Sequence, residues 1–126
     1  GKYEGNFGSD GYLQGFYGDP DARIDFYSPH FYEWMAPHFG LPFDRTPAEF
    51  GLDSSKPVVL GEFPAVGMTS ATKGSRDISG SGCYTLLYEN GWNGGFAWTS
   101  NGVDRCGTLD DFREGTREVA RRGLSR

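Results

Sequence analysis

The feature that most restricts the fold is an apolar run, Val58-Val59-Leu60, within the segment KPVVLGEF at residues 56–63. A strand with one face in water alternates apolar and polar side chains, whereas a strand buried on both faces is apolar throughout. Strands of the second kind belong mostly to parallel sheets, because helices cover both faces of such sheets. The segment therefore predicts a buried parallel strand in an α/β fold.

Helix and strand signals alternate along the rest of the chain. Further strands are predicted at 23–32, with an end or bend at Pro29, and at 95–99. Helices are predicted at 10–17, capped by Ser9 and ended near Gly18; after the capping box Thr46-Pro47-Ala48-Glu49, ended at Gly51; at 77–90, ended by Gly91; and at 109–122, capped by Thr108 and ended by Gly123. This alternation predicts a parallel α/β architecture.

The spacing of three residues narrows the architecture. His30, Glu62 and Trp98 each lie at the C-terminal end of a predicted strand, 32 and 36 residues apart. A (β/α)8, or TIM, barrel has one unit every ~31 residues and carries its catalytic residues at these strand ends. No Gly-rich phosphate loop follows any strand, which disfavours a doubly wound sheet. We expect residues 1–126 to be the C-terminal part of one barrel, about strands 6–8 with their helices, with the remainder upstream of Gly1.

Composition excludes several classes of function. The net charge is −5, which argues against nucleic acid or anionic lipid as a partner, and no apolar stretch approaches the ~18 residues of a membrane span. The basic run at residues 117–126 suits a helix C-terminus. Cys83 and Cys106 fit either one disulfide or two buried thiols, and free thiols are favoured. No metal-ligand spacing includes His38, so a metal site is rejected.

Four residues are candidates for chemistry. A carboxylate at the mouth of a buried strand is costly without partners, so Glu62 is more readily explained by function than by structure. His30 and Tyr32 are two residues apart and face the same way on an extended chain, although a core histidine beside a core tyrosine fits equally. Trp98 suits stacking on a sugar ring but also a core position. Trp34 could extend such a platform, and Trp92 is interpreted as a packing residue.

Three segments together resemble glycoside hydrolase family 5, whose retaining (β/α)8-barrel members include cellulases and β-mannanases. They are DFYSPHFY at 25–32, PVVLGEF at 57–63 and GFAWT at 95–99. The resemblance implies that Glu62 is the catalytic nucleophile and that His30 and Tyr32 line the subsite of the cleaved sugar, Tyr32 also orienting Glu62. It implies Trp98 as the stacking platform, a secreted protein, a polysaccharide substrate and no cofactor.

The resemblance also implies a part that this chain lacks. The acid/base glutamate of the family follows an asparagine at the end of strand four, and no Asn-Glu pair occurs here. We therefore expect an endo-type hydrolase of β-1,4-linked glucan or mannan whose acid/base lies upstream, and an isolated chain without activity. The alternatives are a non-catalytic carbohydrate-binding module, which would be a β-sandwich with few helices, and a barrel fragment that has only a structural role.

Overall fold

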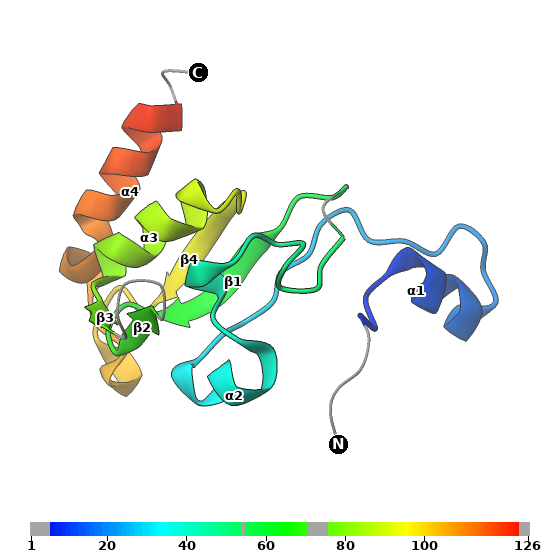
Figure 1. Cartoon of the computed structure of the whole chain (residues 1–126), viewed down its shortest axis with the longest axis horizontal. Coiled ribbons are helices and arrows are strands. Elements are labelled where there is room, and N and C mark those ends of the chain that lie inside the picture. The colour runs from blue at the N-terminus through cyan, green and yellow to red at the C-terminus, as the bar shows by residue number, and fades with distance from the viewer. Residues whose placement is uncertain (1–5, 54, 71–75, 124–126) are drawn as a thin grey trace.

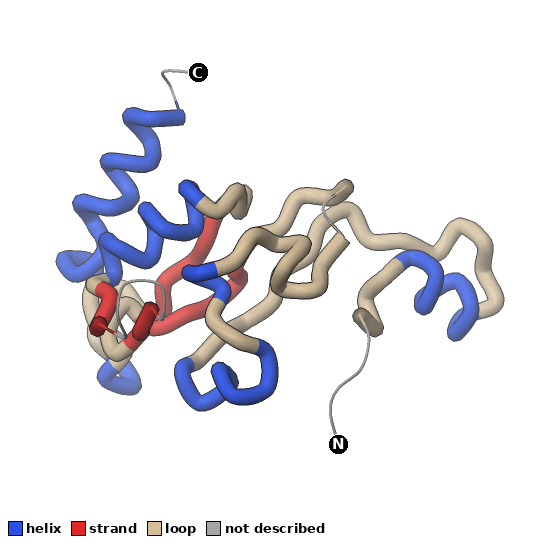
Figure 2. Tube along the Cα trace, viewed as in Figure 1, coloured by secondary structure: helices blue, strands red, loops and turns tan. Residues whose placement is uncertain are grey.

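The computed structural model describes residues 6–53, 55–70 and 76–123. The first residues of the chain, from Gly1, and the end of the basic run at 124–126 lie outside these residues. Figures 1 and 2 show the arrangement of the elements. They are α1 (Asp10–Tyr17), η1 (Glu33–Met35), α2 (Ala36–Phe39), η2 (Pro42–Asp44), β1 (Val59–Pro64), β2 (Met68–Ser70), β3 (Arg76–Ile78), α3 (Gly80–Glu89), β4 (Gly94–Trp98), η3 (Val103–Arg105) and α4 (Leu109–Gly123).

The strand β1 lies between two parallel neighbours. On one edge it pairs with β4, from Val59 opposite Gly94 to Pro64 opposite Trp98. On the other edge it forms parallel bridges to the segment 27–30, which places Tyr27 beside Val58 and His30 beside Glu62. The chain therefore has the expected α/β character with a parallel sheet, and β1 is its central strand. The described residues do not form a closed barrel.

The predicted strand at 23–32 is wrong as a continuous strand. The segment is extended, but it reaches β1 only through the two bridges. Pro29 lacks a backbone N–H and contributes its carbonyl alone, accepting from Gly61 N at 2.7 Å. The ladder is further interrupted because β1 carries an irregularity between Leu60 and Phe63. The segment still places His30 directly beside Glu62.

The helix α3 packs against β4 on one side of the sheet, and α4 packs against α3 (Figure 1). They approach closely because Gly115 of α4 has no side chain: a Cβ there would lie 2.3 Å from the carbonyl oxygen of Ser81. The hydroxyl of Ser81 accepts from Gly115 N at 3.0 Å and donates to Asp111 O at 3.2 Å. The crossing therefore depends on a small residue and on hydrogen bonds from one serine.

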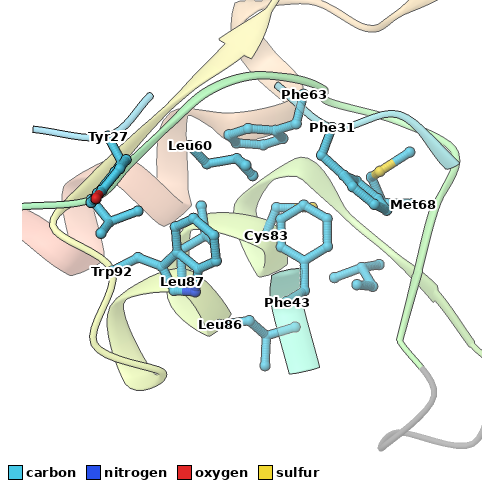
Figure 3. Packing of buried hydrophobic residues seen from close by; sticks show 12 residues of the cluster. Tyr27, Phe31, Phe43, Leu60, Phe63, Met68, Cys83, Leu86, Leu87 and Trp92 are labelled. Atoms are coloured by element: carbon cyan, nitrogen blue, oxygen red, sulfur yellow. The ribbon is translucent and has the colours of Figure 1, made fainter. Parts of the chain in front are cut away.

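The core lies between the sheet, α3 and the segment around η2. Figure 3 shows its aromatic and aliphatic side chains converging from these elements. Its members are Tyr27, Phe31, Phe43, Val58, Leu60, Phe63, Met68, Ile78, Cys83, Leu86, Leu87 and Trp92. The ring of Phe43 contacts both Phe31 and Phe63 edge to face, with centroids 6.2 and 5.6 Å apart. These contacts pack the segment 27–31, β1 and η2 against one another.

Two of the predicted helices are corrected. The capping box forms, because Thr46 N donates to Glu49 Oε2 at 2.8 Å and Glu49 N to Thr46 Oγ1 at 3.2 Å, but only a turn follows it. The predicted helix at 77–90 begins instead at Gly80, since Asp77 and Ile78 pair with β2 in an antiparallel hairpin. Ser79 caps it by accepting from Gly82 N.

The helices α1 and α4 have the predicted bounds to within one residue. No residue of α1 is buried, and it lies away from α3 and α4 (Figure 1). It is tied to the sheet through Asp10, which pairs with Lys56 ahead of β1 and accepts from Ile24 N at 3.3 Å. Within the described part of the chain, none of the helices combines the length and the apolar character that crossing a membrane requires.

Candidate active site

Glu62 lies near the C-terminal end of β1, the central strand. Its carbonyl accepts from Phe31 N at 2.8 Å on one edge, and on the other edge β4 pairs with Leu60 and Phe63, on either side of Glu62. The preceding residue, Gly61, leaves room for its neighbours: a Cβ there would lie 2.2 Å from Ser28 Oγ and 3.1 Å from the His30 ring. A glycine before Glu62 therefore lets the His30 side chain lie against the strand.

Two side chains contact the Glu62 carboxylate. The hydroxyl of Tyr32 donates to Oε1, and Nδ1 of His30 lies 3.6 Å from Oε2. The Glu62 side chain is only 24% exposed, whereas that of His30 is 58% exposed. Burial, followed by the hydrogen bond and the negative charge of Glu62, raises the pKa of Tyr32 well above its usual range. Tyr32 is thus a neutral, permanent donor to the carboxylate.

Trp98 ends β4, at the level of Pro64 two residues beyond Glu62. Its side chain is 39% exposed, and its indole Nε1 donates to Asp104 Oδ2 at 3.1 Å. The peptide bond that follows, Trp98–Thr99, is cis. The four predicted site residues therefore all lie toward the C-terminal ends of three adjacent parallel segments, and His30 and Tyr32 each contact Glu62.

The loop after β4 brings Asp104 and Cys106 toward the end of β1, and neither residue was among the predicted site residues. The carbonyl of Cys106 accepts from Ala65 N at 2.7 Å, which places the loop over the end of β1. Asp104 accepts from Nε1 of Trp98, and its negative charge is one of the smaller influences that raise the pKa of Tyr32. The dipeptide Asn101-Gly102 predicts a turn at this point. No pattern in the sequence predicts that the turn brings Asp104 back to Trp98.

The two cysteines are both free thiols, the state that the sequence analysis favoured. Burial raises the pKa of the Cys83 thiol to about 12 and makes it a core residue. The pKa of Cys106 is raised by burial and then by the carboxylates of Asp104 and Glu62. Neither thiol is a reactive thiolate at neutral pH.

Of the other aromatic and histidine candidates, Trp92 is buried and donates to Arg45 O at 2.8 Å, which makes it a packing residue as predicted. Trp34 is 72% exposed on η1. His38 lies on α2. Among the residues that the structure describes, no three His, Cys, Asp or Glu side chains gather as metal ligands would.

A groove of about 600 Å³ opens beside His30. Its walls are mainly apolar and come from the segment before η1, from α2 and from the turn at 50–52. The lining residues are Asn6, Phe7, Pro29, His30, Met35, Phe39, Phe50, Gly51 and Leu52. Of the four predicted site residues, His30 is the one that lines this groove. Beside it, the partly buried Glu62 carboxylate with its neutral phenol donor has the chemistry of a nucleophile.

Comparison with known proteins gives one informative match. No family model matches the chain, and no curated protein matches it either. Among solved structures, the crystal structure of endo-1,4-beta-mannanase from Eisenia fetida matches with a TM-score of 0.67 and 26% sequence identity. The match covers 90% of this chain and 30% of the mannanase chain. The chain is therefore similar, over nearly all its length, to somewhat less than a third of an endo-1,4-β-mannanase.

Proposed function

We propose that this chain is the C-terminal part of the (β/α)8 barrel of a retaining glycoside hydrolase, with Glu62 as its nucleophile. The observation that carries the proposal is the Glu62 carboxylate, held by Tyr32 and His30 at the end of the central parallel strand. The similarity of the chain to part of an endo-1,4-β-mannanase also supports it. In this proposal residues 1–126 contribute about strands 6–8, and the remainder of the barrel is the partner of this unit.

The proposed reaction has two steps. In the first, the ionised Glu62 attacks the anomeric carbon while the glycosidic bond breaks, and an acid/base carboxyl about 5–5.5 Å away protonates the leaving oxygen. In the second, the same acid/base takes a proton from water, which attacks the anomeric carbon and releases Glu62. This chain supplies the nucleophile, and the acid/base glutamate belongs to the remainder of the barrel. No metal or organic cofactor takes part.

The other site residues bind and orient in this proposal. Tyr32 remains protonated because its pKa is raised, so it donates to Glu62 throughout the physiological pH range and fixes the attacking oxygen. His30 and Tyr32 line the subsite of the cleaved sugar. Trp98, with an exposed indole face, is the platform on which the apolar face of that sugar stacks.

β-1,4-Mannan is the first choice of substrate, because the matched structure is an endo-1,4-β-mannanase. β-1,4-Glucan is the second, since loops outside the shared residues select the polymer. In this proposal the enzyme is secreted or extracytoplasmic, as the resemblance to glycoside hydrolase family 5 implies. The helices and the parallel strand pair favour this proposal over a carbohydrate-binding module, whose usual β-sandwich is antiparallel and poor in helices.

The test is a matched pair of substitutions in the natural protein, assayed on soluble β-mannan and carboxymethyl-cellulose. Glu62→Gln keeps the shape of the side chain and removes the nucleophile, so kcat should fall more than about 1,000-fold while substrate binding persists. Glu114→Gln alters a glutamate that is exposed on α4 and should leave kcat within about twofold. A change of only a few-fold in Glu62→Gln would remove Glu62 from the chemistry.

A further inference from the structure

The indole of Trp98 is held by a residue outside the strand that carries it. Its Nε1 donates to Oδ2 of Asp104 at 3.1 Å, a bond to a charged acceptor. Trp98 is 39% exposed, so packing covers only part of the ring. A half-exposed indole can rotate about two side-chain bonds, and a hydrogen bond at its nitrogen restricts that rotation. Asp104 is therefore placed to set the plane of the ring.

Several backbone hydrogen bonds of the loop at 99–108 hold Asp104 beside the indole nitrogen of Trp98. The two ends of the loop are joined by an antiparallel bridge between Asn101 and Thr108 and by Leu109 N donating to Ser100 O at 3.1 Å. Beyond Asp104, the carbonyl of Cys106 accepts from the N–H of Ala65, the residue that directly follows β1. These ties fix the loop relative to the strands on both sides of Trp98.

The backbone at the tip of this loop adopts a conformation that most side chains avoid. Asp104 has a φ of 59° and Arg105 a φ of 60°, both in the left-handed region. Aspartate and asparagine tolerate this region better than other non-glycine residues, but a long side chain such as arginine does not favour it. Two successive residues held there are the mark of a loop whose shape is imposed by its surroundings, a feature concentrated at functional sites.

The negative charge of Asp104 is also among the smaller influences that raise the pKa of Tyr32, after burial and the effects of Glu62.

We propose that Asp104 is a positioning residue, which fixes the indole of Trp98 in the orientation that a bound sugar requires. This inference rests on the proposed function for the meaning of that orientation, but the hydrogen bond itself is testable without it. Asp104 acts through Trp98 and takes no part in bond breaking. Its effect on the reaction should therefore disappear when the indole is absent.

The first experiment concerns the indole alone. The natural protein, labelled with ¹⁵N in its tryptophan indoles, is compared by NMR with Asp104→Gly and Asp104→Asn, and Trp98→Phe identifies the Trp98 signal. Glycine accepts the left-handed backbone but has no acceptor, whereas asparagine keeps an oxygen acceptor and also tolerates that backbone. We expect the Trp98 indole signal to move upfield and exchange faster with solvent in Asp104→Gly, and to return toward its original position in Asp104→Asn. An unchanged signal in Asp104→Gly would overturn the inference, whatever the protein hydrolyses.

The second experiment is a double-mutant cycle in hydrolysis of soluble β-mannan. Asp104→Gly should lower kcat/KM by about fivefold to tenfold in the parent protein, the loss expected for one ordinary net hydrogen bond at a partly exposed group. In the Trp98→Ala background the same substitution should change kcat/KM by less than about twofold, because coupled residues are not additive. Equal losses in both backgrounds would show that Asp104 does not act through Trp98. Absence of hydrolysis in the parent, with the expected indole response, would count against the proposed function and leave the positioning of Trp98 supported.

Discussion

Replacing Gly115 by alanine tests the packing that holds the sheet and its helices together. In the structure a Cβ at this position would lie 2.3 Å from the Ser81 carbonyl oxygen and 2.5 Å from its Cα, while ordinary contact begins at 3.4 Å. The obstructing atoms are backbone, so no side-chain rotation relieves the overlap. The helices α3 and α4 must separate by about 1 Å. Separation weakens the bonds that Ser81 Oγ makes to Gly115 N and Asp111 O.

The expected magnitude follows from three contributions. Overpacking costs about 1–3 kcal/mol, and weakening the Gly115 N bond adds about 1 kcal/mol. Alanine returns up to about 1 kcal/mol, because it is a better helix former than glycine. Gly115→Ala should therefore lower the free energy of unfolding by about 1–3 kcal/mol.

Urea denaturation followed by circular dichroism measures this as a lower midpoint with an unchanged m-value. The matched control is Gly123→Ala on the same helix, where the added Cβ meets nothing within 4 Å, and it should be neutral or slightly stabilising. If Gly115→Ala were as stable as Gly123→Ala, α3 and α4 would not cross as described.

Three further predictions concern the site and its supports. Tyr32→Phe should lower kcat/KM by about 10- to 100-fold, because a hydrogen bond to a charged acceptor is lost; a loss under about twofold would leave Tyr32 without a role. Purified residues 1–126 should not hydrolyse β-mannan or carboxymethyl-cellulose, and turnover that disappears in Glu62→Ala would contradict this. The pKa of Asp10 is lowered first by its hydrogen bond with Lys56, so the tie of α1 to the sheet is complete above the usual value of 3.8 and is lost as the pH falls through the lower folded value. Hydrogen exchange in α1 should accelerate in that acidic range, and Asp10→Asn should produce the same acceleration at neutral pH. If neither the lower pH nor the substitution changed the exchange rate, the pair Asp10–Lys56 would not hold α1 to the sheet.

Much of the architecture could be predicted from local signals. The apolar run Val58-Val59-Leu60 predicted a parallel strand, and β1 with its two parallel neighbours confirms it. The caps at Ser9 and Thr108 marked the starts of α1 and α4 correctly, because capping is decided by a few adjacent residues. Such signals do not depend on distant parts of the chain.

The predictions from sequence failed where contacts between residues far apart in the chain determine the local structure. The capping box at Thr46 has both of its hydrogen bonds, yet the segment after it runs on as a turn toward β1. Asp77 and Ile78 were predicted to begin a helix, but they pair with β2 instead. No local sequence pattern indicates that contact. The role inferred for Asp104 likewise depends on a loop returning to Trp98, so residue spacing at the strand ends could indicate His30, Glu62 and Trp98 but not Asp104.

The central claim is that Glu62 forms a covalent bond with the substrate, and trapping that bond tests it most directly. A 2-deoxy-2-fluoro-β-glycosyl fluoride, in the mannosyl and glucosyl forms, reacts with the nucleophile of a retaining enzyme and releases from it slowly. Mass spectrometry of the inactivated natural protein should show one added fluorosugar, located by peptide mapping on Glu62 and absent in Glu62→Gln. A fluorosugar on a different residue, or steady turnover of the substrate with inversion at the anomeric carbon, would contradict the account.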